Sequence, residues 1–173
     1  RHNASGSRSF RYGSTRRHLL SLTAVFIDGT VRTFRRGEPL DFPYEPVRQV
    51  ATTKNTAGYY LPEGATWTGL LCGSEGTLAV VAEAEVSLLP QPQSLLAGVV
   101  FFEDQDAALA AVERWRAVAQ LNMLEFMDEA SLELLRSDAA APVPAAARAC
   151  LMIEQELDGL QGDAIDAWLE RLA

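Results

Sequence analysis

The chain has 173 residues, of which 48% are hydrophobic and 22% are charged, and its net charge is −8. This length and composition predict one full domain or two small ones with a buried core, and they exclude collagen-like, coiled-coil and wholly disordered chains. No apolar run reaches the roughly 18 residues that a membrane span needs. The first residues contain neither an initiator Met nor an apolar signal core, so we expect a piece of a longer protein.

The charge is divided unevenly along the chain. Residues 1–54 hold ten basic residues against four acidic ones, whereas residues 55–173 hold five against nineteen. This division predicts two regions with different roles. A nucleic-acid partner is not expected, because the basic segment lacks interleaved lysines and aromatic platforms and the sequence pI is about 4.8.

Histidines and cysteines give no sign of a metal site or a nucleophilic catalyst. Cys72 and Cys150 match no zinc or redox spacing, and we expect both to be buried, reduced thiols in a cytoplasmic protein. His2 and His18 are the only histidines, and neither lies in a metal-binding or catalytic-triad motif. We therefore assign no metal ligand and no catalytic residue within this chain.

Residues 1–92 read as loops around a few strands. Residues 1–18 predict an ordered loop or a loop that leads into a short turn, and 22–27 with 30–34 predict a hairpin whose turn is Asp28-Gly29. Residues 49–62 predict a loop with at most one helical turn. A tight turn at 73–77 then leads into a strand at 78–89 that stops at Pro90.

After Pro90-Gln91-Pro92 the pattern alternates between strands and helices. Strands are predicted at 95–102, 123–127 and 149–157. Helices are predicted at 104–120, after a cap at Asp128, and around Trp168, whereas 139–147 predicts a surface loop. The order indicates an α+β fold with helices on a small sheet, and we expect Trp115 and Trp168 to be core residues.

Two glycine-containing segments are candidate ligand loops. Residues 3–13, Asn-Ala-Ser-Gly-Ser-Arg-Ser-Phe-Arg-Tyr-Gly, would let a ligand approach main-chain N–H groups closely. Residues 73–77, Gly-Ser-Glu-Gly-Thr, would present main-chain groups at the start of a strand. Taken singly, each segment is more often an ordinary loop or turn.

Together these segments resemble the second half of the FAD-binding domain in the vanillyl-alcohol-oxidase/PCMH superfamily. The similar branch contains glycolate oxidase FAD subunits, D-lactate dehydrogenases and flavin–iron-sulfur fusion dehydrogenases. The resemblance rests on residues 3–13, 24–29, 54–59 and 73–81, and on Leu124-Glu-Phe-Met-Asp128 at the start of a substrate-cap domain. It implies that residues 1–92 are the second subdomain of an FAD-binding domain and residues 93–173 part of a ferredoxin-like α+β cap.

The resemblance also implies a cofactor and a set of site residues. FAD would contact Asn3, Ala4, Ser5, Gly6, Tyr12, Gly13, Gly73, Glu75, Gly76, Val80 and Val81. Lys54, Asn55 and Tyr59 would face the substrate. For Tyr59 the open alternative is half-buried packing, for Lys54 a surface ion pair, and for Glu75 a structural bond that orients the turn. Because the first FAD-binding subdomain would precede residue 1, we expect this fragment to bind FAD weakly or not at all.

The resemblance implies a parent enzyme that oxidises a 2-hydroxy acid such as glycolate or D-lactate by hydride transfer to flavin. Its further partner would be an electron acceptor or an iron-sulfur domain or subunit, and a homodimer is an open alternative. The location would be cytoplasmic, with peripheral attachment at the inner membrane face left open. The competing hypothesis is a non-catalytic α+β small-molecule-binding or interaction module.

Overall fold

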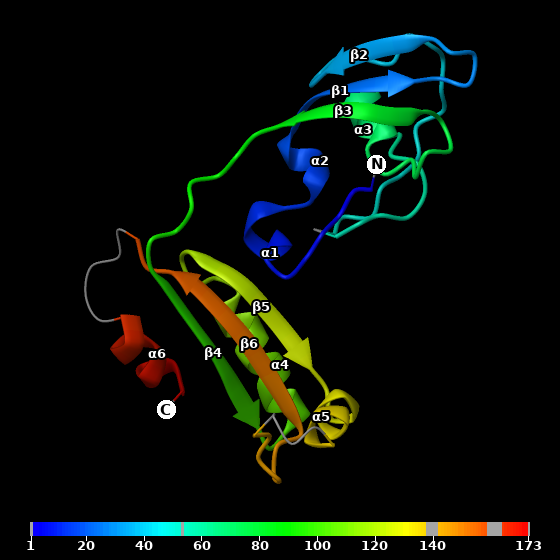
Figure 1. Ribbon diagram of the computed structural model, residues 1–173. Coiled ribbons are helices and arrows are strands. Elements are labelled where there is room, and N and C mark those ends of the chain that lie inside the picture. Colours follow the sequence, from blue (N-terminus) through cyan, green and yellow to red (C-terminus); the bar gives the residue numbers. More distant parts are fainter. Residues whose placement is uncertain (1, 53, 138–141, 159–163, 173) are drawn as a thin grey trace. The chain divides into compact units, whose positions relative to one another are not determined.

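The computed structural model describes residues 2–52, 54–137, 142–158 and 164–172, which form two compact units. Unit 1 contains the described residues up to Ser9 and Gly13–Pro90, and unit 2 contains Phe10–Tyr12 and the described residues from Gln91 onward. Each unit is built on one three-stranded antiparallel sheet with helices (Figure 1). The predicted α+β class is confirmed.

The sheet of unit 1 has the order β2-β1-β3, with bounds β1 (Leu19–Val25), β2 (Val31–Arg35) and β3 (Val80–Val86). The predicted hairpin is present, and Thr30 N–H donates to Asp28 Oδ1 at 2.9 Å across its turn. This hydrogen bond to Thr30 lowers the pKa of the Asp28 carboxyl. The third strand is shorter than the predicted range 78–89, because it begins at Val80 and ends at Val86.

The first 90 residues also contain three short helices: α1 (Ser9–Tyr12), of which only Ser9 belongs to unit 1, α2 (Thr15–His18) and α3 (Trp67–Leu71). The first two lie where a loop was predicted, so that prediction was incomplete. The third begins at Thr66, whose Oγ1 accepts a hydrogen bond from Gly69 N–H at 3.2 Å. A threonine at this position is a regular helix N-cap, and it fixes the start of a helix that is buried along its whole length.

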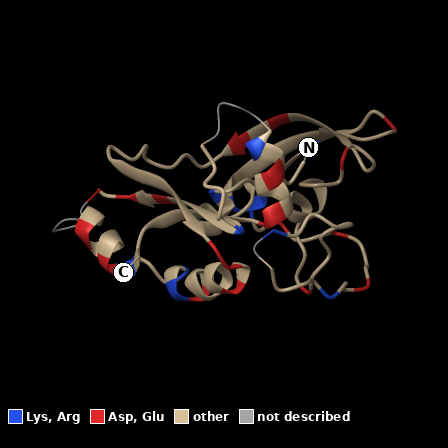
Figure 2. Ribbon diagram, turned by 90° about the horizontal axis from the view of Figure 1, so that it is seen from below, with Lys and Arg blue, Asp and Glu red and all other residues tan. Residues whose placement is uncertain are grey.

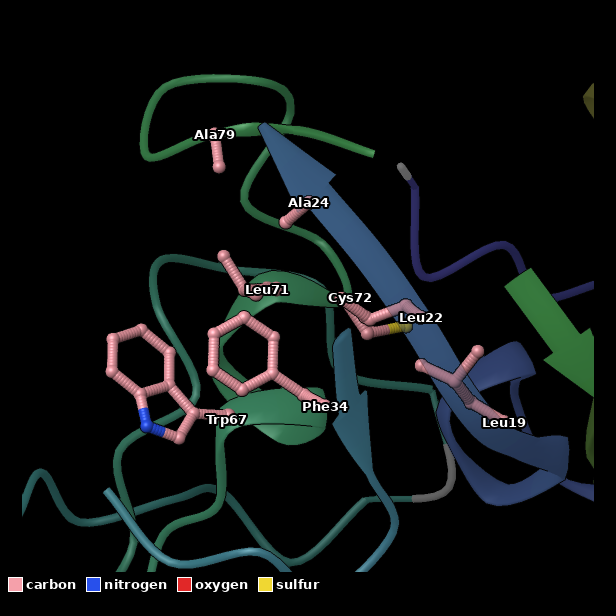
Figure 3. Packing of buried hydrophobic residues seen from close by; sticks show 8 residues of the cluster. All are labelled: Leu19, Leu22, Ala24, Phe34, Trp67, Leu71, Cys72 and Ala79. Carbon is pink, nitrogen blue, oxygen red and sulfur yellow. The ribbon is translucent and has the colours of Figure 1, made fainter. Parts of the chain in front are cut away.

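The core of unit 1 lies between the sheet and α3. Figure 3 shows the rings of Phe34 and Trp67 facing each other, and they stack at 4.6 Å between centroids. Leu22 and Leu71 are buried beside them, and the methyl group of Ala79 joins the same cluster. Thus alternate residues of β1 and β2 point into one apolar layer, while Thr23 and Thr33 lie on the outer face.

Unit 2 alternates strands and helices as predicted. Its strands are β4 (Leu95–Phe102), β5 (Leu121–Met127) and β6 (Ala149–Glu156), and its helices are α4 (Gln105–Trp115), α5 (Glu129–Arg136) and α6 (Ala164–Leu172). The sheet order is β4-β6-β5, with β6 antiparallel to both neighbours. The chain therefore runs β4-α4-β5 as a split β-α-β unit with β6 inserted between its strands.

Both faces of the second sheet are partly covered by helices. On one face Trp115 of α4 and Trp168 of α6 pack edge to face at 5.2 Å over Leu151 and Ile153, so the prediction that both tryptophans are core residues is confirmed. On the other face Leu132 of α5 packs near Cys150. Helix α4 ends at Trp115, five residues before its predicted end at Gln120.

Asp128 caps α5 as predicted, and its Oδ1 accepts a hydrogen bond from Ser131 N–H at 2.9 Å. Hydrogen bonding to Ser131 lowers the pKa of this carboxyl. The predicted loop at 139–147 lies partly outside the described residues.

Figure 2 marks the positions of charged residues along the ribbon, among them those of α6 near the C-terminus. Both cysteines are buried and unpaired, as predicted.

Within the described part of the chain, no helix is long and apolar enough to cross a bilayer. The same residues contain no cluster of three or more His, Cys, Asp or Glu that suits a metal ion.

We predict that Phe34→Ala destabilises unit 1 by about 3–5 kcal/mol, because it removes a fully buried ring and the stacking partner of Trp67. Ile27→Ala, at a fully exposed position of the hairpin, should change the free energy of unfolding by less than about 0.5 kcal/mol. Amide hydrogen exchange of β1 and β2 measures the effect, with β6 as the internal reference. Equal effects of the two substitutions would contradict the core assignment.

Candidate functional site

A hollow of about 500 Å³ in unit 1 is lined almost entirely by short side chains. Its lining residues are Ala4, Ser5, Gly6, Ser9, Gly13, Ser14, Thr15, His18, Val86 and Ser87. Four of the residues that the sequence predicted to contact a cofactor therefore come together here: Ala4, Ser5, Gly6 and Gly13. Short side chains leave the main chain accessible, so a ligand in this hollow would meet backbone atoms and hydroxyl groups.

Local hydrogen bonds hold the shape of the loop around the hollow. Gly6 N–H donates to Ser9 Oγ at 2.9 Å, and Ser9 N–H returns a bond to Gly6 O at 2.9 Å. Thr15 donates through its N–H and its hydroxyl to Ala4 O, at 3.1 and 3.0 Å. The loop is thus closed on α1 at one side and on α2 at the other, which keeps the hollow open without large side chains.

The two glycines of the hollow serve different purposes. At Gly13 the φ angle is +80°, and an added Cβ would lie 2.9 Å from Arg17 Cδ, so the fold itself requires glycine there. At Gly6 an added Cβ would meet nothing within 4 Å. A Cβ at Gly6 is therefore compatible with the described fold, and a ligand in the hollow would compete with it for space.

Asn3 is the hub that connects this loop to the rest of unit 1. Its side chain is only 3% exposed, and its Oδ1 accepts a hydrogen bond from Arg16 N–H at 2.9 Å. Its Nδ2 donates to Asn55 O at 3.4 Å, and the Cys72 thiol lies 3.9 Å from Oδ1. The amide thus joins the loop at 3–9, the predicted substrate segment at 54–59 and the end of α3.

Arg16 also binds the end of α3. Its guanidinium donates to Gly69 O at 3.2 Å and to Cys72 O at 2.7 Å, which satisfies carbonyl groups at the end of α3. It also lies 4.0 Å from the centre of the Tyr60 ring. Partial burial lowers the pKa of Arg16, against a smaller upward effect of Cys72 and Tyr60. Burial also raises the pKa of the Cys72 thiol.

The turn at 73–77 lies beside Asn3. Gly73 has φ +96°, and an added Cβ would be 3.2 Å from Asn3 Cβ, so the two segments touch at a position where only glycine fits well. Gly76 has φ +84° with open space around it. Asn3 of one predicted segment and Gly73 of the other therefore meet in unit 1. The hollow itself is lined by residues between 4 and 18 and by 86–87, and no residue of 73–81 lines it.

Glu75 and Tyr59 bind the turn to its neighbours. Glu75 adopts φ +58°, which is rare for a residue with a side chain, and its Oε1 lies 2.7 Å from His2 Nδ1. Tyr59 OH lies 2.7 Å from Thr77 Oγ1, which donates in turn to Ser74 O at 2.6 Å. The predicted substrate-facing Tyr59 is thus attached through its hydroxyl to the predicted cofactor turn. The residue is 43% exposed.

Other predicted residues lie elsewhere. Val80 is exposed on the outer face of the sheet, whereas Val81 packs against the core. Lys54 O accepts the hydroxyl of Thr52 at 3.1 Å. These positions neither line the hollow nor join the Asn3 hub, so a cofactor or substrate role for them stays a prediction.

Tyr12 belongs to unit 2, together with its neighbour Arg11. Arg11 donates to Glu156 Oε2 and Asn122 Oδ1, both at 2.7 Å, and Tyr12 OH donates to the same two atoms at 3.2 and 3.1 Å. Asn122 is 1% exposed and also donates to Glu154 Oε1 at 3.2 Å. Sequence reasoning missed this cluster, because its partners are more than a hundred residues apart and share no motif.

Comparison with known proteins gives a family-level result. Residues 91–167 match the family model described as "FAD linked oxidases, C-terminal domain". The chain is 34% identical to glycolate oxidase subunit GlcD of Bacillus subtilis over 155 residues, which are 89% of this chain and 29% of that protein.

Two D-lactate dehydrogenases are similarly related. The chain is 33% identical to the mitochondrial D-lactate dehydrogenase (cytochrome) 1 of Saccharomyces cerevisiae, over 77% of this chain and 19% of that protein. It is 35% identical to D-lactate dehydrogenase of Archaeoglobus fulgidus, over 76% of this chain and 25% of that protein. The chain thus spans less than a third of the length of each of these relatives.

We predict that Asn3→Ala exposes Cys72, because the missing amide releases the loop at 3–9 from α3 and leaves buried polar groups unpaired. Such a loss costs about 1–3 kcal/mol, so alkylation of Cys72 should speed up roughly tenfold or more. Cys150 in unit 2 is the internal control, and its labelling rate should not change. Mass spectrometry after iodoacetamide pulses measures both. Equal acceleration of the two thiols would show general unfolding and contradict the hub.

Proposed function

Because the chain belongs to the family of FAD-linked oxidases, we propose that it is part of an FAD-dependent dehydrogenase or oxidase that acts on a 2-hydroxy acid such as glycolate or D-lactate. The names of the relatives from Bacillus, yeast and Archaeoglobus support this substrate class. Residues 1–92 would be the second subdomain of its FAD-binding domain, and residues 93–173 would begin the cap.

The hollow of unit 1 is the observation that carries the cofactor assignment. FAD is large and flat and needs main-chain atoms that it can approach closely, and the residues present meet that need. Open space at Gly6 and the short side chains of Ala4, Ser5 and Ser14 would admit one edge of the molecule. Hydroxyl and N–H groups of the same loop would hold its polar atoms.

The described residues of this site are suited to binding and orientation. When bound, FAD supplies the hydride acceptor, and the protein supplies position and electrostatics. Asn3 holds the cofactor loop, the 54–59 segment and the 73–77 turn in one arrangement, while Tyr59 fixes the substrate segment to that turn. Lys54 would attract the carboxylate of the substrate. A cytoplasmic location and an electron acceptor or iron-sulfur partner remain parts of this proposal.

The substrate class is tested on the longer protein that contains this chain, purified with its flavin. Anaerobic addition of glycolate or D-lactate should bleach the flavin absorbance near its visible maximum, because hydride leaves the carbon that bears the hydroxyl. The matched control is (R)-propane-1,2-diol, which keeps that carbon but lacks the carboxylate and should be inactive. A flavin that no 2-hydroxy acid reduces would reject the proposal.

The cofactor assignment is tested by Gly6→Val in the same longer protein. The added side chain occupies space that is empty without ligand, so the fold should be retained while FAD binds at least about tenfold more weakly, equivalent to about 1.4 kcal/mol. Ala117→Val, at an exposed position in unit 2, is the control for added bulk. Flavin content and circular dichroism measure the two effects. Full flavin content in Gly6→Val would place the cofactor elsewhere.

A further inference from the structure

Helix α1 (Ser9–Tyr12) is divided between the two units of the chain. Ser9 belongs to unit 1, whereas Phe10–Tyr12 belong to unit 2. A helix of four residues makes about one turn, and helices this short are not stable without contacts from the rest of the protein. The position of α1 therefore depends on the side chains that anchor it.

Arg11 and Tyr12 anchor the second half of α1 in unit 2. The Arg11 guanidinium donates to Glu156 Oε2 and Asn122 Oδ1, both at 2.7 Å, and to Gln120 O at 3.2 Å. Tyr12 OH lies 3.2 and 3.1 Å from the same two side-chain oxygens. We call the side chains of Arg11, Tyr12, Asn122 and Glu156 the α1 anchor.

The α1 anchor is largely shielded from water, which strengthens its hydrogen bonds. The side chains of Arg11 and Glu156 are 29% and 19% exposed, and Asn122 is 1% exposed. The Asn122 amide group donates to Glu154 Oε1 at 3.2 Å, so its oxygen is directed at Arg11 and Tyr12. Charge-assisted bonds in such surroundings are stronger than exposed ion pairs, and removal of Arg11 leaves buried acceptors with fewer donors.

The residues on either side of the anchored segment, Ser9 and Gly13, both line the hollow of unit 1. Ser9 Oγ accepts a hydrogen bond from Gly6 N–H at 2.9 Å, and Ser9 O accepts one from Gly13 N–H at 3.0 Å. Ser9 is itself 6% exposed. Because Ser9 is bonded to both glycines of the hollow, a displacement of α1 would disturb all three positions.

We propose that Arg11 and Glu156 are positioning residues for the cofactor loop. Their ion pair holds α1, and α1 in turn keeps Ser9 and its two glycine partners in the conformation that leaves the hollow open to FAD. The inference rests on the proposed cofactor site, and it adds that side chains outside the hollow set the affinity of that site. Tyr12, which the sequence predicted as a cofactor contact, would contribute through the same anchor.

Hydrogen exchange of the purified chain tests the anchor without any cofactor. In Arg11→Ala the amides of Gly6 and Gly13 should exchange about tenfold faster or more, because α1 is released. The amides of Leu151 and Ile153 in β6 should keep their exchange rates. The matched control is Arg148→Ala, which removes another arginine ion pair of unit 2, that with Glu129 of α5, and should leave both glycines unchanged.

A second variant, Glu156→Gln, keeps the shape of the side chain and removes only its charge. It should accelerate the two glycine amides in the same direction. The double variant with Arg11→Ala should exchange no faster than Arg11→Ala alone, because both substitutions break the same ion pair. Glycine amides that keep their wild-type rates in both single variants would overturn the proposal. So would an equal acceleration in β6, which would show that the anchor only stabilises unit 2.

The consequence for FAD is measured on the longer protein, freed of flavin and titrated with FAD. Arg11→Ala should raise the dissociation constant about tenfold or more, whereas Arg148→Ala should leave it unchanged. Faster glycine exchange with wild-type FAD affinity would overturn the positioning role. Full flavin content in Gly6→Val is a different outcome: it would reject the hollow as the cofactor site, and this inference with it.

Discussion

The arrangement of the candidate site depends on one buried side-chain amide, that of Asn3. A primary amide has two donors and one acceptor oxygen, and burying it without partners is costly. Here Arg16 N–H, Asn55 O and the Cys72 thiol all lie around it. The same residue therefore sets where the hollow begins, where the predicted substrate segment runs and where the turn after α3 starts.

The burial of the Asn3 side chain changes the interpretation of the segment at 3–13. The sequence presented Asn3 as one of several cofactor contacts, whereas the structure directs its side chain into the protein. Gly6 and Gly13, a few residues later, lie at the hollow. The motif thus combines a residue that anchors the loop with residues that leave room for a ligand. Such a division suits a site that recognises its cofactor mainly through the main chain.

The sequence predicted the strands and long helices well, because their side chains repeat with the period of the element. Strand β4 has its predicted bounds, and the predicted cap at Asp128 is in place. Helices α1, α2 and α3 were missed, since four or five residues are too short to show a helical period. The Thr66 cap before α3 was the one local signal that would have indicated a helix there.

The sequence indicated the segments of the candidate site, but it did not indicate the hydrogen bonds that join them. Glycine-rich turns are visible in a sequence, and the structure places Asn3 beside the 73–77 turn in unit 1. The bonds that join them depend on the tertiary fold: Tyr59 meets Thr77, and Asn3 meets Cys72. In unit 2, Arg11 bonds to Asn122 and Glu156, which are more than a hundred residues away in the sequence, so no local pattern could have indicated this cluster.

The described polar side chains around the candidate site are largely engaged within the protein, and this limits the chemistry that they can perform. Arg16 is held by two carbonyl groups and a tyrosine ring, and Glu75 by His2. A cation or carboxylate fixed in this way is well placed to orient a loop and poorly placed to exchange protons with a substrate. The glycine and serine main chain is what remains open to a ligand. A redox reaction built on this unit would therefore use its residues to position a cofactor, and the cofactor would carry the electrons.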